Sequence, residues 1–256
     1  MEKKPVIGLD DVAAVHNSPG SLYHSLGHII RAKIEAGEWE IGQKIPAERE
    51  MMEIFSISRA TVRQGIDNLV KEGILYRVQG KGTFVSPPKI EHGVLRILDF
   101  CDLVDQTGLK SSSQMIAKQE IIPPLNVQNT LRLGKGEKVL WIRRLILVNN
   151  IQVMIESSYL PTNQFPEMED QYRGVNAPHV HVFKHYGKKI FRVKEMFEPV
   201  VLEGAEAKIL GTEGGYPALW VEISAFDEND SPFEFLTALI RGDRVRTYYE
   251  MVVDRC

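Results

Sequence analysis

The hydrophobic period of the chain changes at Gly73, and this change restricts the folds that the preceding residues can adopt. Before Gly73, apolar residues recur at helical spacing in three segments that end at Gly37, Phe55 and Gly73. After it, "ILYRVQ" and "TFVS" are two short strands around the glycine-rich turn 80–82. Three helices and a hairpin, with "SIS" as a short turn between the second and third helices, predict a winged helix-turn-helix.

Local signals set the ends of these helices. Gly37 occupies the position that favours a left-handed residue after the first helix, and Pro46 with Glu48 begins the second. Ser58 is the expected N-cap of the third helix, and Gly73 its terminator. The face of the third helix expected to enter the core consists of Val62, Ile66, Leu69 and Val70.

A length of 256 residues favours two domains. The division we expect is a flexible arm over 1–20, the winged helix-turn-helix over 21–86, a linker over 87–93 that contains Pro87-Pro88, and a second domain over 94–256.

The second domain is predicted to be α+β with a mainly antiparallel sheet. "VLWIRRLILV" and "IQVMIESSYL" form a hairpin around Asn-Asn, "PALWVEISAF" and "PFEFLTALIR" form another around a polar loop, and "VRTYYEMVVD" is a last strand. Helical patterns fall near 126–133, 177–186 and 203–210. This mixture of hairpins and helices is typical of an α+β domain.

Composition limits the classes of function. The two cysteines are far apart, and the N-terminal residues lack the apolar core of a signal peptide. The longest apolar runs are interrupted by arginines and are too short to span a bilayer, so we expect a cytoplasmic protein with no membrane partner. A formal charge of −3 argues against a polyanion-binding surface over the whole molecule.

Cations are instead concentrated at the start of the third helix. Arg59 and Arg63 are four residues apart and lie one above the other, beside the apolar face. Such a helix presents its N-terminal residues to the major groove, where arginine forks onto guanine or phosphate. Ser58 and Thr61 add hydroxyl groups suited to phosphate oxygens.

Two further regions complete this pattern. Arg49 lies in the preceding helix, where it can meet the DNA backbone, and the turn Gly80-Lys81-Gly82 would bring Lys81 close to the duplex. Taken singly, the two arginines of the third helix are equally compatible with a solvated helix face, and Gly-Lys-Gly with a plain hairpin turn. The combination predicts binding to double-stranded DNA.

Residues 41–85, "IGQKIPAEREMMEIFSISRATVRQGIDNLVKEGILYRVQGKGTFV", closely resemble the N-terminal domain of the GntR family of bacterial transcription regulators. That family has the hallmark run "LPSERELA…FGVSRTTVRQAL..L..EGLL.R..GRGTFV". Ala60 departs from it, since a hydroxyl residue is usual there. The resemblance implies DNA contacts by eight residues: Arg49, Ser58, Arg59, Thr61, Arg63, Gly80, Lys81 and Gly82.

Residues 94–254 resemble, more loosely, the effector-binding UTRA module of the HutC subfamily, which has a chorismate-lyase-like α+β fold. The resemblance is carried by Arg144, Glu156, Tyr159-Leu160-Pro161, "HYG" at 185–187 and "PFE…IRGDR" at 232–244. It implies that a small-molecule effector binds in this domain. The effector-binding residues that it implies are Arg144, Glu156, His179 and Glu234.

The chain departs from the family's sugar-phosphate pocket at several positions. Ile146 replaces the second arginine of an Arg-x-Arg pair, Ala177 and His179 replace a Ser-x-Tyr, and Ile240 replaces a tyrosine. A buried phosphate would then lack compensating charge, so we expect an effector that is not a sugar phosphate. Arg144 is expected to pair with a carboxylate of the effector. The alternative is that Arg144 simply pairs with Glu156 across adjacent strands.

Other chemistries have little support in the sequence. His179, His181 and His185 share one predicted helix, but only the last two have i, i+4 spacing, so no metal site is expected. No nucleophile elbow, HExxH motif or acid–base pair is present, and we expect no catalytic residue, no cofactor and no enzyme activity.

These observations predict a homodimeric, effector-responsive repressor that reads a palindromic operator, because half-site symmetry follows dimer symmetry. Two alternatives remain. One is a DNA-binding protein whose C-terminal domain is purely structural, and the other is an enzyme of chorismate-lyase-like fold fused to a regulatory DNA-binding head.

Overall fold

The computed structural model describes residues 7–17, 20–93, 100–174 and 176–248. It divides into two compact units, Met1–Lys89 and Ile90–Cys256. Each unit has its own core of buried apolar residues.

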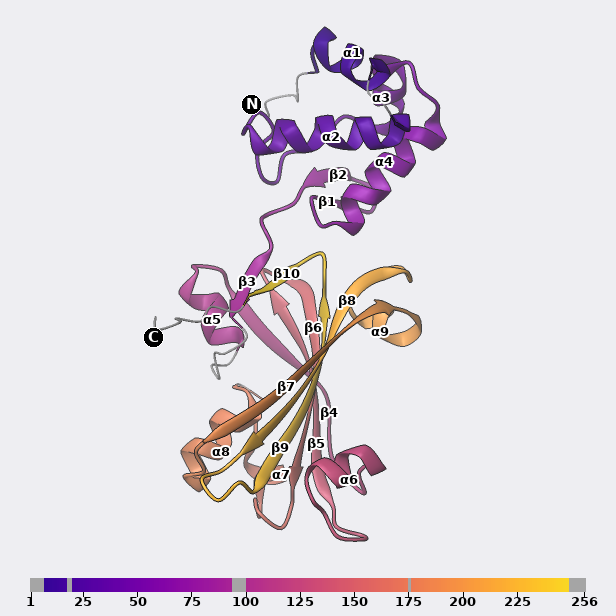
Figure 1. The fold of residues 1–256 in the computed structure, drawn as a ribbon. Coiled ribbons are helices and arrows are strands. Elements are labelled where there is room, and N and C mark those ends of the chain that lie inside the picture. Colours follow the sequence, from indigo (N-terminus) through magenta and orange to yellow (C-terminus); the bar gives the residue numbers. More distant parts are fainter. Residues whose placement is uncertain (1–6, 18–19, 94–99, 175, 249–256) are drawn as a thin grey trace, which may run out of the picture. The chain divides into compact units, whose positions relative to one another are not determined.

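The first unit is the expected winged helix-turn-helix (Figure 1). Its elements are α1 (Leu9–Asn17), α2 (Leu22–Glu35), α3 (Glu48–Phe55), α4 (Arg59–Lys71), β1 (Leu75–Val78) and β2 (Gly82–Val85). β1 and β2 form an antiparallel hairpin, which is the wing. The apolar face of α4 is buried as predicted, and it consists of Val62, Ile66, Leu69 and Val70.

A left-handed residue makes the turn between α3 and α4. Ser56 has φ 52° and ψ 40°, in the left-handed region that glycine adopts without a Cβ penalty. Ser58 then begins α4 as its N-cap, and its Oγ accepts a hydrogen bond from the backbone N–H of Thr61 at 3.1 Å. The direction in which α4 leaves this turn therefore depends on two serines.

The predicted arm over 1–20 requires correction, because its described part contains α1. Val15 is fully buried, and a ring nitrogen of His16 lies 2.8 Å from the carbonyl oxygen of Phe55 at the end of α3. Asp11 of α1 also forms an ion pair of 2.9 Å with Lys33 of α2. Packing and these contacts stabilise a helix in a segment whose composition alone indicated a flexible arm.

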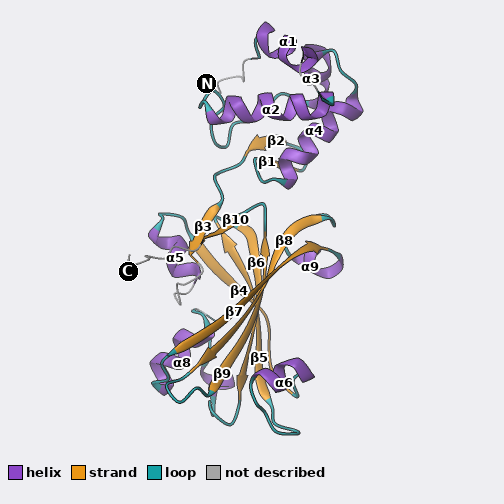
Figure 2. Ribbon diagram, viewed as in Figure 1, coloured by secondary structure: helices purple, strands orange, loops and turns teal. Residues whose placement is uncertain are grey.

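The second unit is built on a six-stranded antiparallel sheet with the strand order β4-β5-β6-β9-β8-β7 (Figure 2). The strands are β4 (Ser111–Ile121), β5 (Val139–Val148), β6 (Ile151–Pro161), β7 (Arg192–Leu202), β8 (Tyr216–Phe226) and β9 (Pro232–Arg241). The Asn-Asn turn is confirmed, since Asn149 and Asn150 have φ of 48° and 64° and join β5 to β6.

Helices cover both faces of this sheet. The apolar clusters on one face include residues of α5 (Phe100–Gln106), α7 (Met168–Gln171) and α8 (Pro178–Tyr186). Those on the other face include residues of α6 (Leu125–Thr130) and α9 (Gly204–Ile209). The predicted helices near 126–133, 177–186 and 203–210 correspond to α6, α8 and α9, whereas α5 and α7 were not predicted.

The linker expected over 87–93 also differs from the structure. Its last four residues form β3 (Ile90–Gly93), which pairs in parallel with β10 (Val245–Tyr248). Ile90 packs against an apolar cluster of the second unit, so the boundary between the units falls after Lys89. The strand predicted over 245–254 is observed to Tyr248, and the rest lies outside the described residues.

Within the described ranges, every helix is too short or too polar to cross a lipid bilayer.

We expect Ser56→Gly to stabilise the first unit by about 0.5–1 kcal/mol, because glycine relieves the left-handed strain at this exposed turn. Differential scanning calorimetry should show a higher unfolding temperature. Ser21→Gly is the matched control, since Ser21 has φ −79° and makes no side-chain capping bond. An unfolding temperature for Ser56→Gly at or below that of the wild type would contradict the account of this turn.

Candidate functional site

The start of α4 exposes two arginines. The side chain of Arg59 is 76% exposed and that of Arg63 is 65% exposed. Burial of the opposite face of α4 fixes this orientation. The Oγ of Ser58 and the Oγ1 of Thr61 lie 2.8 Å apart, so both hydroxyls contribute to the helix cap at the same exposed end.

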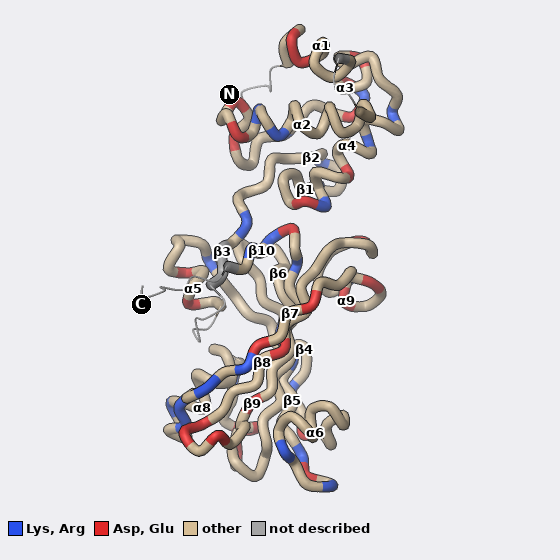
Figure 3. The backbone as a smooth tube through the Cα atoms, in the orientation of Figure 1, with Lys and Arg blue, Asp and Glu red and all other residues tan. Residues whose placement is uncertain are grey.

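Carboxylates lie close to both arginines. Glu48, in the first turn of α3, lies 3.6 Å from Arg59 Nε, and Asp67 lies 3.9 Å from Arg63 Nε. These are long contacts in which the arginine side chain is largely exposed and the carboxylate half-buried, and such pairs contribute little stability. Neither arginine is therefore locked in an internal salt bridge. Figure 3 shows basic and acidic positions interspersed along α3, α4 and the wing.

Arg49 and the wing carry the other predicted cations. The side chain of Arg49 is 88% exposed and pairs with Glu53 at 3.1 Å, an i, i+4 contact within α3. In the wing turn, the N–H of Lys81 bonds the carbonyl of Val78 at 3.0 Å. The flanking glycines need their conformational freedom, since Gly80 has φ 73° and Gly82 has φ 125°.

Two basic residues of this region were missed by sequence reasoning. Arg77 of β1 forms ion pairs with both carboxylates, at 2.5 Å from Asp67 and 3.7 Å from Glu48. Lys44 lies against Gly82, where a Cβ would come within 2.7 Å of its Cε. The arginine in "LL.R" of the hallmark run was a signal for Arg77. No sequence signal placed Lys44 beside the wing, because this contact joins segments far apart in the chain.

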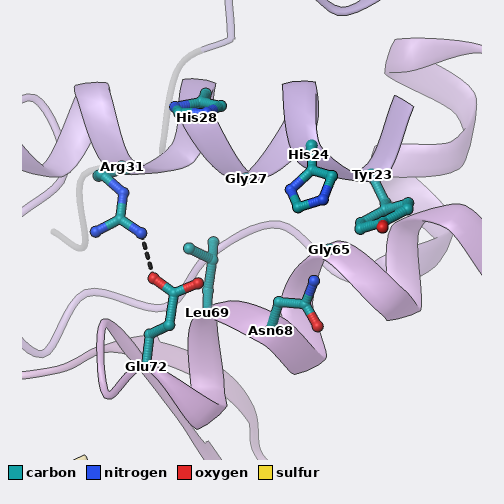
Figure 4. A pocket seen from close by; sticks show the side chains of 9 residues that line it. All are labelled: Tyr23, His24, Gly27, His28, Arg31, Gly65, Asn68, Leu69 and Glu72. Atoms are coloured by element: carbon teal, nitrogen blue, oxygen red, sulfur yellow. Dashed lines mark hydrogen bonds and ion pairs between the residues drawn. The ribbon is translucent and has the colours of Figure 1, made fainter. Parts of the chain in front are cut away.

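A polar cavity of about 140 Å³ lies on the side of α4 that faces α2 (Figure 4). At one end of it Arg31 of α2 forms an ion pair with Glu72, the C-cap of α4. At the other end α2 approaches α4 so closely that a Cβ on Gly65 would lie 3.0 Å from the carbonyl oxygen of Tyr23. These contacts hold α4 against α2 and leave its arginine-bearing end exposed.

In the second unit, charged residues form a layer between two apolar clusters on one face of the sheet. Arg144 of β5 lies between Ile142 of one cluster and Ile146 of the other. Glu156 of β6 is directly opposite Arg144, and Glu234 of the next strand, β9, interacts electrostatically with both residues and with His179. We call Arg144, Glu156, Glu234 and His179 the polar layer.

Arg144 is held by protein groups. Its Nε donates a hydrogen bond of 3.0 Å to Glu156, its second terminal nitrogen donates to the same oxygen, and its first donates at 2.9 Å to the carbonyl of Asn176. Only 1% of the Arg144 surface is exposed. The structure thus shows the cross-strand pair that was the alternative to a contact with an effector carboxylate.

Glu234 is the buried carboxyl that lacks such a partner. Among the described residues, none hydrogen-bonds to Glu234 Oε1 or to His179 Nε2, and both atoms are buried. Burial raises the pKa of the Glu234 carboxyl, the charge of His179 opposes this rise, and the carboxylate of Glu156 adds to it. A raised pKa favours the protonated, neutral form of Glu234. The charges that remain on the sheet strands of the layer are then those of the Arg144–Glu156 ion pair, which compensate each other.

Of the four positions that depart from the sugar-phosphate pattern, three are apolar and buried. Ile146, Ala177 and Ile240 are each at most 8% exposed, and the two isoleucines belong to one apolar cluster. None of them can bind a phosphate oxygen through its side chain.

The histidines of α8 are not arranged as a metal site. The rings of His181 and His185 stack at 4.1 Å, and Tyr172 meets His181 edge-on. Burial lowers the pKa of His181, and the charge of His185 lowers it further. Within the part of the chain that is described, no group of three or more His, Cys, Asp or Glu residues could hold a metal ion.

Two family models match the chain. Residues 22–85 match the model of bacterial regulatory proteins of the gntR family, and residues 106–246 match the UTRA domain. The two matches coincide with the winged helix-turn-helix and with the six-stranded sheet unit.

Curated relatives and solved structures agree with these matches. The chain is 34% identical to the HTH-type transcriptional repressor NagR of Bacillus subtilis, over 89% of this chain and 93% of that protein. It is 26% identical to the histidine utilization repressor of Pseudomonas aeruginosa, over 79% and 80%. The crystal structure of PhnF from Mycobacterium smegmatis superimposes with a TM-score of 0.64 at 25% identity, covering 88% of this chain and 99% of that one.

We expect Glu234→Gln to remove a pH-dependent loss of stability. Because the folded-state pKa of Glu234 is raised, the native state binds more protons than the unfolded state, and this group's contribution falls as pH rises above the unfolded value of 4.5. Glutamine resembles the protonated carboxyl. The variant should therefore gain stability over the wild type as pH rises, until the folded pKa is passed.

Urea denaturation at a series of pH values measures this difference. Glu213→Gln, in an exposed loop, is the control and should track the wild type. A difference between Glu234→Gln and the wild type that stays constant with pH would contradict the assigned direction.

Proposed function

This chain belongs to the GntR family of bacterial regulatory proteins, and from that membership we propose that it is a transcriptional repressor controlled by a small-molecule effector. The gntR-type winged helix-turn-helix followed by a UTRA domain is the makeup of the HutC subfamily. The names of its relatives, which are transcriptional repressors, support repression as the direction of control.

The exposure of Arg59 and Arg63 at the start of α4 is the observation that carries the DNA-binding proposal. With the opposite face of α4 buried, this end is the part of the helix that can enter a major groove, where guanidinium groups read guanine or hold phosphate. We assign Arg49, Ser58 and Thr61 to the flanking backbone. The turn at 80–82, with Lys81 at its tip, is assigned to the adjacent groove or phosphates.

We propose that two copies bind a palindromic operator, since the symmetry of half-sites follows that of a dimer. The exposed apolar side chains of β7, an edge strand of the large sheet, support self-association. Met196, Phe197 and Val201 are 49%, 43% and 58% exposed. Exposed apolar residues gathered on one edge strand are typical of a surface that pairs with another chain.

We place the effector at the polar layer. Arg144 already pairs with Glu156, so the groups left for a ligand are Glu234 and His179, whose buried atoms lack hydrogen bonds among the described residues. A phosphate would meet only the imidazole of His179 there, because the Arg144 guanidinium is already compensated by Glu156, whereas a hydroxyl or amino group would satisfy Glu234. The effector we propose is therefore a small molecule that carries hydrogen-bond donors and no phosphate.

Such an effector changes DNA binding only if it binds one arrangement of the protein more tightly than another. Glu234 lies on β9, and Glu156 on the neighbouring β6, so a ligand at the polar layer acts on two adjacent strands of the sheet. Absence of enzyme activity stays a prediction beside this regulatory role, and turnover assays test it.

We expect Arg59→Ala and Arg63→Ala each to weaken operator binding by about 1–3 kcal/mol, because each removes a guanidinium from the major-groove end of α4. The operator duplex is obtained by selection from a random pool with the wild-type protein. Fluorescence anisotropy over a series of salt concentrations should also show a smaller salt slope wherever a lost arginine neutralised a phosphate.

Lys71→Ala is the matched control, because Lys71 is an exposed cation at the opposite end of the same helix. It should retain wild-type affinity. Sedimentation should find two chains per duplex. Equal losses for Lys71→Ala and the two arginine variants would indicate general charge attraction and would contradict the assigned interface.

We expect an unphosphorylated hydroxyl- or amino-bearing compound to stabilise the protein more than its phosphate ester does. A thermal-shift screen of sugars and amino sugars, each paired with its phosphate ester, measures this. A ligand at a hundred times its dissociation constant should stabilise by about 2.7 kcal/mol. Glu234→Gln should weaken binding of the best compound, and Glu213→Gln should not. Tighter binding of the esters would contradict the proposed effector chemistry.

A further inference from the structure

Besides the two arginines assigned to DNA binding, further charged side chains lie near the exposed side of α4. Glu48 of α3 and Asp67 of α4 lie among Arg59, Arg63 and Arg77. Carboxylates on a surface that meets phosphate would repel the DNA, because like charges disfavour approach. Some group must therefore neutralise these two carboxylates before DNA can bind well.

Arg77 is placed to do so. It is the one arginine among the described residues that contacts both carboxylates, with Asp67 Oδ1 at 2.5 Å and Glu48 Oε1 at 3.7 Å. Asp67 Oδ1 is shielded from solvent, so its charge depends on a protein partner. The Arg77 side chain is 41% exposed, against 76% for Arg59 and 65% for Arg63.

The distances rank the ion pairs of Asp67 but not those of Glu48. Asp67 lies 2.5 Å from Arg77 and 3.9 Å from Arg63, whereas Glu48 lies about equally far from Arg77, at 3.7 Å, and from Arg59, at 3.6 Å. Without Arg77, each carboxylate would have one of these arginines as its remaining close cation, and attraction over a few ångströms favours a shorter pair. Glu48 would then hold Arg59, and Asp67 would hold Arg63, away from DNA.

We propose that Arg77 is a positioning residue for DNA binding: it neutralises Glu48 and Asp67 and thereby leaves Arg59 and Arg63 available to the duplex. Because Arg77 lies on β1 and Asp67 on α4, the same ion pair also ties the wing to α4. Arg77 acts on DNA binding through other residues and without a phosphate contact of its own. This inference rests on the proposed function.

Arg77 could act in two ways, and these lead to different expectations when both carboxylates are replaced by carboxamides. If Arg77 acts by neutralising them, its loss should have little effect in a protein that carries Glu48→Gln and Asp67→Asn. If Arg77 binds phosphate directly, its loss should weaken binding equally in both backgrounds. In both, the slope of log affinity against log salt concentration should also become shallower, by about the amount that one phosphate contact contributes. A double-mutant cycle separates the two roles.

The experiment measures binding of the full chain to the selected operator duplex. In the wild-type background, Arg77→Met should weaken binding about tenfold or more, within the range typical of a lost interfacial arginine. In the Glu48→Gln/Asp67→Asn background, the same change should cost about twofold or less. Arg77→Lys, which keeps the charge, should retain part of the affinity.

Arg31→Met is the matched control, because Arg31 also forms an exposed ion pair with an acidic residue of the unit, Glu72, but lies at the far end of α4. It should leave binding unchanged. Calorimetry on each variant shows whether a loss of affinity comes from a loss of folding. The Glu48→Gln/Asp67→Asn background is a second control, because it restores the affinity of Arg77→Met only if the carboxylate charges cause the loss.

Equal losses in the two backgrounds would overturn the proposal in favour of a direct phosphate contact. No loss in either would also overturn it. If the wild-type protein selects no duplex, the proposed function itself fails, which is a separate outcome from either result.

Discussion

The orientation of α4 is the constraint on which the rest of the DNA-binding unit depends. Burial of Val62, Ile66 and Leu69 fixes the rotation of this helix about its own axis. A helix with one buried side has only one side to offer to a ligand, so the polar residues between these positions must face outward. Core packing and nucleic-acid binding are thus set by the same helical periodicity.

The sheet unit differs from the DNA-binding unit in that several of its charged side chains are buried rather than exposed. Burying an ionisable group is costly unless it is paired, and Arg144 and Glu156 satisfy this condition together. Glu234 does not, and burial shifts its pKa towards the neutral form. An uncompensated group of this kind lowers the stability of the ligand-free protein and increases what a ligand gains by satisfying it.

Much of the fold could be predicted, because helical periodicity and turn residues are local signals. The helices α2, α3 and α4 and the Asn-Asn hairpin followed from them. α1 was missed because its stability comes from Val15 and His16 packing on distant residues. β3 was missed because its partner strand lies some 150 residues later, at Val245–Tyr248. The ion pairs of Arg77 were missed for the same reason: they join three elements, and no single segment encodes them.

The parallel pair of β3 and β10 connects the two ends of the second unit. β10 follows β9 after a turn in which Arg241 binds Asp243 and two backbone carbonyls. β3 comes directly after the boundary at Lys89. The hydrogen bonds between β10 and β3 therefore join the end of β9 to the residues that begin the second unit, so these two places, about 150 residues apart in the sequence, are held in one fixed arrangement.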